Sequence, residues 1–156
     1  MKNTILKTVI AAAFVMVGAL LTANAQSVSG SIANGSVTRG TASRATVVLS
    51  IPGGLHVNSH RPHGDYQIPT SVTASAAGVR IGAVSYPAGR NRKFAFSEST
   101  LNVYEGRASF GFNVTVPPTF KGKTVTVHVS VKYQACTNEV CYAPKTKQVT
   151  LTAKVR

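Results

Sequence analysis

The sequence predicts an all-β fold built from antiparallel strands. Apolar and polar residues alternate along most of the chain beyond residue 25, and the apolar positions are rich in valine, as in half-buried strands. The clearest case is 123–136, in which Val125, Val127, Val129, Val131 and Tyr133 face one way. Gly, Pro and Asn separate the alternating segments, and none of the segments has the spacing of a good helix.

Seven segments are expected to form strands: 45–52, 55–59, 70–76, 78–87, 107–117, 123–136 and 146–155. The segment 55–59 reads as a continuation of 45–52 after the break at Gly53 and Gly54. Seven or more short strands with turn residues between them indicate an immunoglobulin-like antiparallel sandwich in one domain. The chain has no tryptophan, so the Cys-Trp-Cys pattern of antibody domains is absent.

The first 25 residues have the features of a secretory signal peptide. Lys2 and Lys7 are followed by an apolar run from Val9 to Leu21 and by the small-residue site Ala23-Asn24-Ala25. The run is short of the ~20 residues that a membrane-spanning helix needs. We therefore expect residues 1–25 to be removed, residues 26–156 to form the mature domain, and the protein to lie in the periplasm.

The chain is strongly basic, with 17 Lys and Arg against 4 Asp and Glu and a formal net charge of +13. Export argues against a nucleic-acid partner, and the basic residues are spread out except in 90–93, so a solvated basic surface is expected. Four acidic residues leave little for general acid–base chemistry.

The two cysteines, Cys136 and Cys141, lie between the last two predicted strands, where a partner could reach them. A disulfide between them would close a six-residue loop and stabilise the fold by only ~2 kcal/mol, so it would be a weak staple. Lys132, Lys145 and Lys147 would favour a reactive thiolate, and Glu139 would oppose it. Redox exchange is favoured over a structural bond, and zinc is disfavoured because histidines at a matching spacing are lacking.

The segment "VKYQACTNEVCYAPKTKQVTL" resembles the active-site hairpin of the N-terminal periplasmic domain of the thiol:disulfide interchange protein DsbD. Two further stretches are similar to that family: "GGLHVNSHRP" with "YQIPTSV", and "YPAGRNRKFAFSES" with "VYEGRASF". The resemblance covers most of the mature chain. It implies an immunoglobulin-like domain whose two cysteines cycle between dithiol and disulfide.

The resemblance also assigns roles to residues. Cys141 would form the mixed disulfide with the partner, and Cys136 would resolve it. A cap loop in "KFAFSES" would shield the pair through Phe94 or Phe96, and Tyr142 is the better of the two neighbouring tyrosines to shape the site. The implied partners are thioredoxin-fold redox proteins of the disulfide-isomerase and cytochrome c maturation kinds, and no cofactor is expected.

The sequence departs from the best-known form of that family. The loop between the cysteines is one residue shorter, and of the acidic cap residues only Glu98 is nearby. The sequence ends at Arg156, without the membrane conduit and the thioredoxin-like domain of that form. Protein-disulfide reductase activity would therefore need a separate membrane electron donor.

Two alternatives stay open. His56, His60 and His63, with Asp65, have a spacing that could bind copper or zinc, although a polar loop is the simpler interpretation. The domain could also be a non-redox immunoglobulin-like binding module whose hairpin disulfide only shapes an interaction loop.

Overall fold

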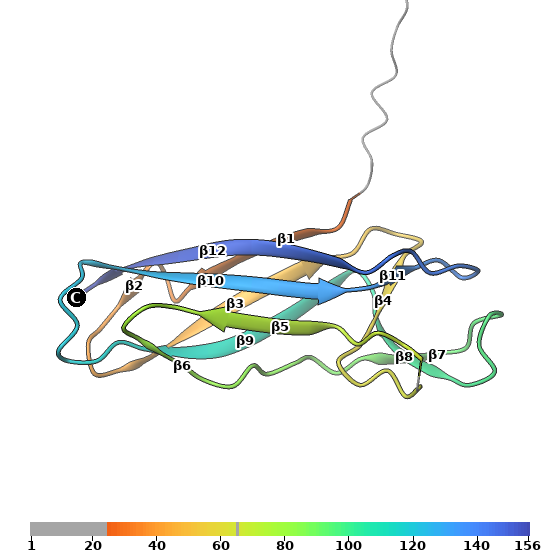
Figure 1. Cartoon of the computed structure of the whole chain (residues 1–156), viewed down its shortest axis with the longest axis horizontal. Coiled ribbons are helices and arrows are strands. Elements are labelled where there is room, and N and C mark those ends of the chain that lie inside the picture. Colours follow the sequence, from red (N-terminus) through yellow and green to blue (C-terminus); the bar gives the residue numbers. More distant parts are fainter. Residues whose placement is uncertain (1–24, 65) are drawn as a thin grey trace, which may run out of the picture.

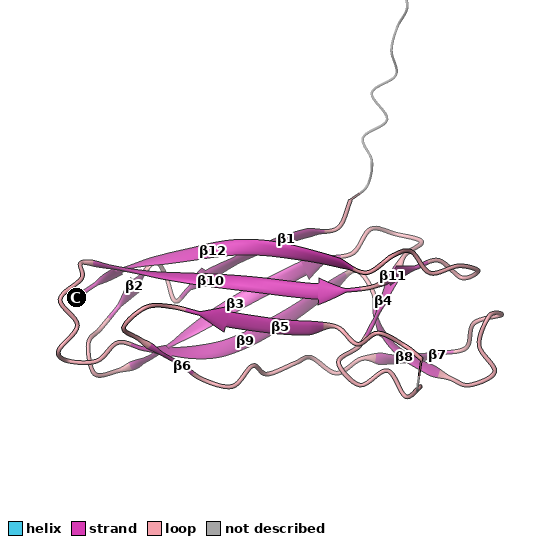
Figure 2. Cartoon of the chain, viewed as in Figure 1, coloured by secondary structure: helices cyan, strands magenta, loops and turns pink. Residues whose placement is uncertain are grey.

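The computed structural model describes residues 25–64 and 66–156, and within them every regular element is a strand (Figure 2). The prediction of an all-β immunoglobulin-like sandwich of antiparallel sheets is thereby confirmed. Over the same residues, no helix is long and apolar enough to cross a membrane. The predicted signal peptide lies outside the described residues, except for Ala25, and stays a prediction.

Two four-stranded sheets form the body of the sandwich (Figure 1). The first sheet has the order β1 (Ser27–Ile32), β3 (Ala42–Ser50), β9 (Arg107–Thr115) and β6 (Arg80–Ile81). The second has the order β2 (Ser36–Val37), β12 (Lys145–Val155), β10 (Thr124–Tyr133) and β5 (Ser71–Ser75). All these pairings are antiparallel except that of β2 with β12.

The core lies between the two sheets. On β10 the valines from Val125 to Val131 and Tyr133 are buried, as the period-2 pattern predicts, while Thr126, His128 and Lys132 are exposed. The facing sheet supplies buried side chains such as Leu49, Phe110 and Phe112. Each large apolar side chain that is fully buried in this core stabilises the fold by ~1.5–3 kcal/mol.

A third, smaller sheet lies at one end of the sandwich (Figure 1). It has the order β11 (Ala135–Cys136), β4 (His56–Asn58), β8 (Leu101–Tyr104) and β7 (Arg90–Arg92). Strand β11 follows β10 almost directly, so this sheet begins where the core strand ends. It brings the cysteine segment beside segments that lie about 30 to 80 residues earlier in the sequence.

Several predicted boundaries are wrong. The segment 55–59 does not continue β3, because Leu55 N donates to Pro52 O in a turn with Gly54 at φ 79°, and β4 then joins the third sheet. Of 78–87 only Arg80–Ile81 is a strand, and the rest meets β9 only through single contacts such as Ser85 with Gly111. Four further strands, β1, β2, β7 and β8, were not predicted from the sequence.

Candidate redox site

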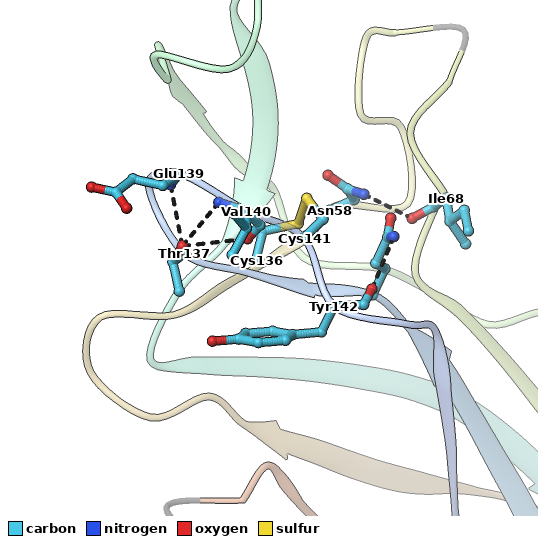
Figure 3. Close-up of a disulfide and its surroundings, with 9 residues drawn as sticks. Asn58, Ile68, Cys136, Thr137, Glu139, Val140, Cys141 and Tyr142 are labelled. Carbon is cyan, nitrogen blue, oxygen red and sulfur yellow. Dashed lines mark hydrogen bonds between the residues drawn. A yellow bond between two sulfur atoms is a disulfide. The ribbon is translucent and has the colours of Figure 1, made fainter.

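Cys136 and Cys141 lie opposite each other in a narrow hairpin and form a disulfide with a Cα–Cα distance of 4.0 Å (Figure 3). Tyr142 N donates to Ala135 O at 2.9 Å on one side of the pair, and Thr137 N donates to Val140 O at 2.8 Å on the other. The cysteines therefore occupy a non-hydrogen-bonded position of an antiparallel pair, where facing side chains come closest. The backbone of the hairpin thus holds the two sulfur atoms together.

The turn of this hairpin is organised by Thr137. Its hydroxyl oxygen accepts hydrogen bonds from Glu139 N at 3.2 Å and Val140 N at 3.1 Å (Figure 3). A threonine that satisfies backbone donors in this way stabilises a tight turn locally. The geometry around the cysteine pair therefore does not depend on the disulfide alone.

The two cysteines differ sharply in exposure. Cys136 on β11 is only 1% exposed, whereas Cys141 lies in the exposed part of the hairpin. Attack on a disulfide needs access to the sulfur that is attacked. Of the two cysteines, Cys141 is therefore the one at the surface of the hairpin.

The loop that joins β7 to β8 carries Phe94 and Phe96 to the same end of the molecule (Figure 1). Phe94 is buried and stacks on His56 with a ring-centroid distance of 4.0 Å. Phe96 is partly exposed and stacks on Phe94 at 5.3 Å. Phe94 also borders a surface hollow with Asn138 and Glu139 of the inter-cysteine turn, so the predicted cap loop lies beside the cysteine hairpin.

On the other side of the hairpin, Tyr142 is about half exposed. It borders an apolar hollow of about 270 Å³ with Leu55, Ala135 and Lys145. In Figure 3 its ring lies below the cysteine hairpin, while its carbonyl accepts a hydrogen bond from Gln134 Nε2 at 3.1 Å. Tyr142 therefore forms part of the surface beside Cys141.

Strand register aligns a row of side chains with the cysteines. Cys136 lies opposite Cys141 on one side and opposite His56 of β4 on the other. In the β4–β8 ladder Val57 pairs with Tyr104, so the next position places Glu105 beside His56. Directly opposed residues point to the same face of a sheet, so these four side chains form one row.

His56 is 2% exposed, and within the described residues its Nε2 is buried without a hydrogen-bond partner. Burial lowers the pKa of the imidazole below its usual value, and the negative charge of Glu105 offsets part of this effect. Glu105 is itself held by an ion pair with Arg92 at 2.8 Å. Burial therefore favours the neutral form of His56, which lies opposite Cys136 across the β4–β11 pair.

The histidine cluster suggested by the sequence does not assemble in the described part of the chain. His60 stacks on Tyr86 at 3.7 Å and His56 on Phe94, and residues 25–64 and 66–156 hold no group of three side chains that could bind a metal. His63 borders a separate hollow with His60. Asp65 lies outside the described residues.

The charged residues expected near the cysteines lie on three different segments. On β12, Lys145 pairs with Tyr133 and Lys147 with Val131, and both lysines are exposed. Glu139 is exposed in the inter-cysteine turn itself. Glu98 lies in the loop between β7 and β8, where its backbone carbonyl accepts a hydrogen bond from Lys93 Nζ.

A scan against protein families matches residues 26–153 to the N-terminal domain of the thiol:disulfide interchange protein DsbD. The chain belongs to the DsbD N-terminal domain family. It is a thiol–disulfide exchange protein of a periplasmic family whose exchange partners are of the thioredoxin-fold type. The predicted family resemblance is thereby confirmed.

The comparison with solved structures includes two related domains. The DsbD N-terminal domain of Neisseria meningitidis, in its reduced form, is 18% identical, with 70% of this chain and 77% of that chain covered and a TM-score of 0.46. The N-terminal periplasmic domain of ScsB from Proteus mirabilis is 10% identical, with a TM-score of 0.46, and the match covers 81% of this chain and 44% of that one. A search of curated proteins gave no match.

No role for Glu105 was predicted from the sequence, and His56 was considered only as part of a possible metal site. Their position beside Cys136 depends on the pairing of β4 with β8 and β11, which join segments far apart in the sequence. The one local signal was a histidine and a glutamate in the two stretches that resemble the family.

Proposed function

We propose that Cys136 and Cys141 are the redox pair of this domain and that Cys141 is the partner-facing cysteine. The observation that carries this proposal is the contrast between the exposed Cys141 and the buried Cys136. Lys145 and Lys147 follow Cys141 closely in the sequence and favour a thiolate there.

The exchange proceeds in two steps. In the dithiol form, the Cys141 thiolate attacks one sulfur of a partner disulfide, forms a mixed disulfide, and displaces the other partner sulfur as a thiolate. Cys136 then attacks Cys141, which closes the intramolecular disulfide and releases the second partner sulfur. The partner gains two electrons and the domain becomes oxidised. A donor dithiol reduces the domain by the reverse steps, with its first attack on Cys141.

Phe94 and Phe96 act as the cap that controls access to the pair, and Tyr142 shapes the docking surface beside Cys141. The burial of Phe94 next to the hairpin and the exposure of Tyr142 support these roles. The acceptors are disulfide-isomerase-like or cytochrome c maturation-like proteins of the thioredoxin fold. A separate membrane protein supplies the electrons.

The mature domain comprises residues 26–156 and is exported after removal of residues 1–25. The burial of Gln26 and the start of β1 at Ser27 support a mature domain that begins with Gln26. Intact mass measurement of protein from the periplasmic fraction tests this assignment, and a mass that includes residues before Gln26 would contradict it.

Trapping of mixed disulfides tests the cysteine assignment. Cys136→Ser leaves Cys141 able to attack but removes the resolving thiol, so it should accumulate a stable mixed disulfide with a thioredoxin-fold partner. Cys141→Ser is the matched control and should trap little, because Cys136 is buried. If only Cys141→Ser captures a partner, the two roles are reversed. If neither variant captures one, the pair is structural.

A further inference from the structure

The Cys136 thiol must lose its proton in the proposed resolving step. Only the thiolate attacks a disulfide, and a thiol in apolar surroundings holds its proton more tightly than one in water. Because Cys136 is 1% exposed, bulk water has little access to this proton. A group inside the site must therefore accept it.

His56 is in position to do so. It lies directly opposite Cys136 across the β4–β11 pair, and the two side chains are on the same face of the sheet. The Cβ atoms of residues opposed in this way are about 4.5–5.5 Å apart. The buried Nε2 of His56 is without a partner among the described residues. Buried polar atoms are almost always hydrogen-bonded, so this unpaired nitrogen requires an explanation, and a catalytic role is one.

Glu105 and the cap complete the arrangement. The β4–β8 register places Glu105 on the side of His56 that is away from Cys136. Phe94 covers the imidazole by stacking on its face at 4.0 Å. Glu105, His56 and Cys136 therefore stand in the order carboxylate, base and nucleophile. In such an arrangement the carboxylate orients the base.

We propose that His56 is the general base for Cys136 in the resolving step and that Glu105 is a positioning residue for His56. The imidazole takes the thiol proton as the Cys136 sulfur attacks Cys141 of the mixed disulfide. A bond forms between the two cysteine sulfurs, the bond from Cys141 to the partner breaks, and the partner sulfur leaves with the electron pair. The imidazolium then returns its proton to solvent or to the departing thiolate. This inference rests on the proposed assignment of Cys136 as the resolving thiol.

The charges around the site fit a base at neutral pH. Burial lowers the pKa of His56, so the imidazole is free to accept a proton. Glu105 stabilises the imidazolium that forms, and Arg92 holds Glu105 through their ion pair. The other charged groups that border the hollow next to Phe94 are Lys93 and Glu139.

The aromatic disulfide dithiobis(nitrobenzoate) separates the two steps in the reduced mature protein. Attack by Cys141 releases a first nitrothiobenzoate, and attack by Cys136 on the resulting mixed disulfide releases a second. Stopped-flow absorbance then gives one rate for each step as a function of pH. We expect His56→Gln to slow the second step by about 100-fold at pH 7, within the usual range for general-base catalysis. The first step should stay within about twofold of the wild type.

The pH profile distinguishes a base from a structural residue. Toward pH 10 the thiol ionises without help, so the second step of His56→Gln should approach the wild-type rate. Glu105→Gln should slow the second step by a smaller factor. His128→Gln, which changes an exposed histidine on β10, should alter neither step. His56→Phe keeps a ring that can stack on Phe94 but has no base, so it should behave like His56→Gln.

Two results would overturn the inference while leaving the redox pair intact. One is a second step in both His56 variants that stays within about twofold of the wild type at every pH. The other is a slowing that persists at pH 10, because a lost base cannot explain it. A wild-type protein that releases only one nitrothiobenzoate would instead overturn the proposed function.

Discussion

Reduction of the disulfide should weaken the fold only modestly. Cys136 and Cys141 are five positions apart in the sequence, and closing so short a loop contributes ~2 kcal/mol in the chain-entropy model. The hydrogen bonds from Tyr142 N to Ala135 O and from Thr137 N to Val140 O remain after reduction. We therefore expect reduction to lower the free energy of unfolding by about 2 kcal/mol and the melting temperature by roughly 6–10 °C.

Urea denaturation followed by circular dichroism, with and without a reductant, measures this difference. The double variant Cys136→Ala/Cys141→Ala is the control, and the reductant should not change its unfolding curve. A loss of about 4.7 kcal/mol or more, which is what a bond closing a loop of ~100 residues would contribute, would refute the reasoning. A collapse of the β-sheet spectrum on reduction would do the same, because it would make the disulfide a structural staple.

Three further outcomes are expected. Replacing Phe94 and Phe96 together by alanine should speed reduction of the disulfide by dithiothreitol several-fold, and an unchanged rate would argue against a cap. Burial lowers the pKa of His56 in the folded state, so the unfolded state binds more protons below pH ~6.5 and stability falls with acid. Urea titrations at pH 7.5 and pH 5 should therefore show a larger loss for the wild type than for His56→Phe, and equal losses would contradict this. Tyr133→Phe removes a buried hydroxyl that lacks a partner in the described residues, so it should leave the free energy of unfolding unchanged or raise it. A decrease of more than about 1 kcal/mol would contradict this, because it would mean that the hydroxyl is hydrogen-bonded in the folded protein.

The sandwich could be predicted from the sequence wherever one face of a strand is buried. β10 and β9 alternate clearly because they pack on the core on one side and face solvent on the other. β7 and β8 were not predicted, because β7 is wholly exposed and β8 is almost wholly buried, so neither strand alternates between exposed and buried residues. β1 was not predicted, because its residues, "SVSGSI", are mostly small and polar and only Ile32 among them is fully buried.

The site was predictable only in part. The short Cys136–Cys141 spacing and the flanking motif pointed to the redox hairpin without any structure. The row from Glu105 through His56 to Cys136 depends on strand register between segments distant in sequence, and β4 has only three residues to signal it. The exposure of Cys141 and the burial of Cys136 are also tertiary facts, since both residues lie within one short hairpin.

The reduction potential of the Cys136–Cys141 pair tests the central claim most directly. It can be measured by equilibrating the domain in glutathione buffers of stated ratio and quantifying free thiols after acid quenching. A pair that exchanges electrons with thioredoxin-fold partners should have a midpoint between roughly −120 and −270 mV, the range of such oxidoreductases. A midpoint below about −300 mV, which is typical of structural disulfides in secreted proteins, would contradict the account.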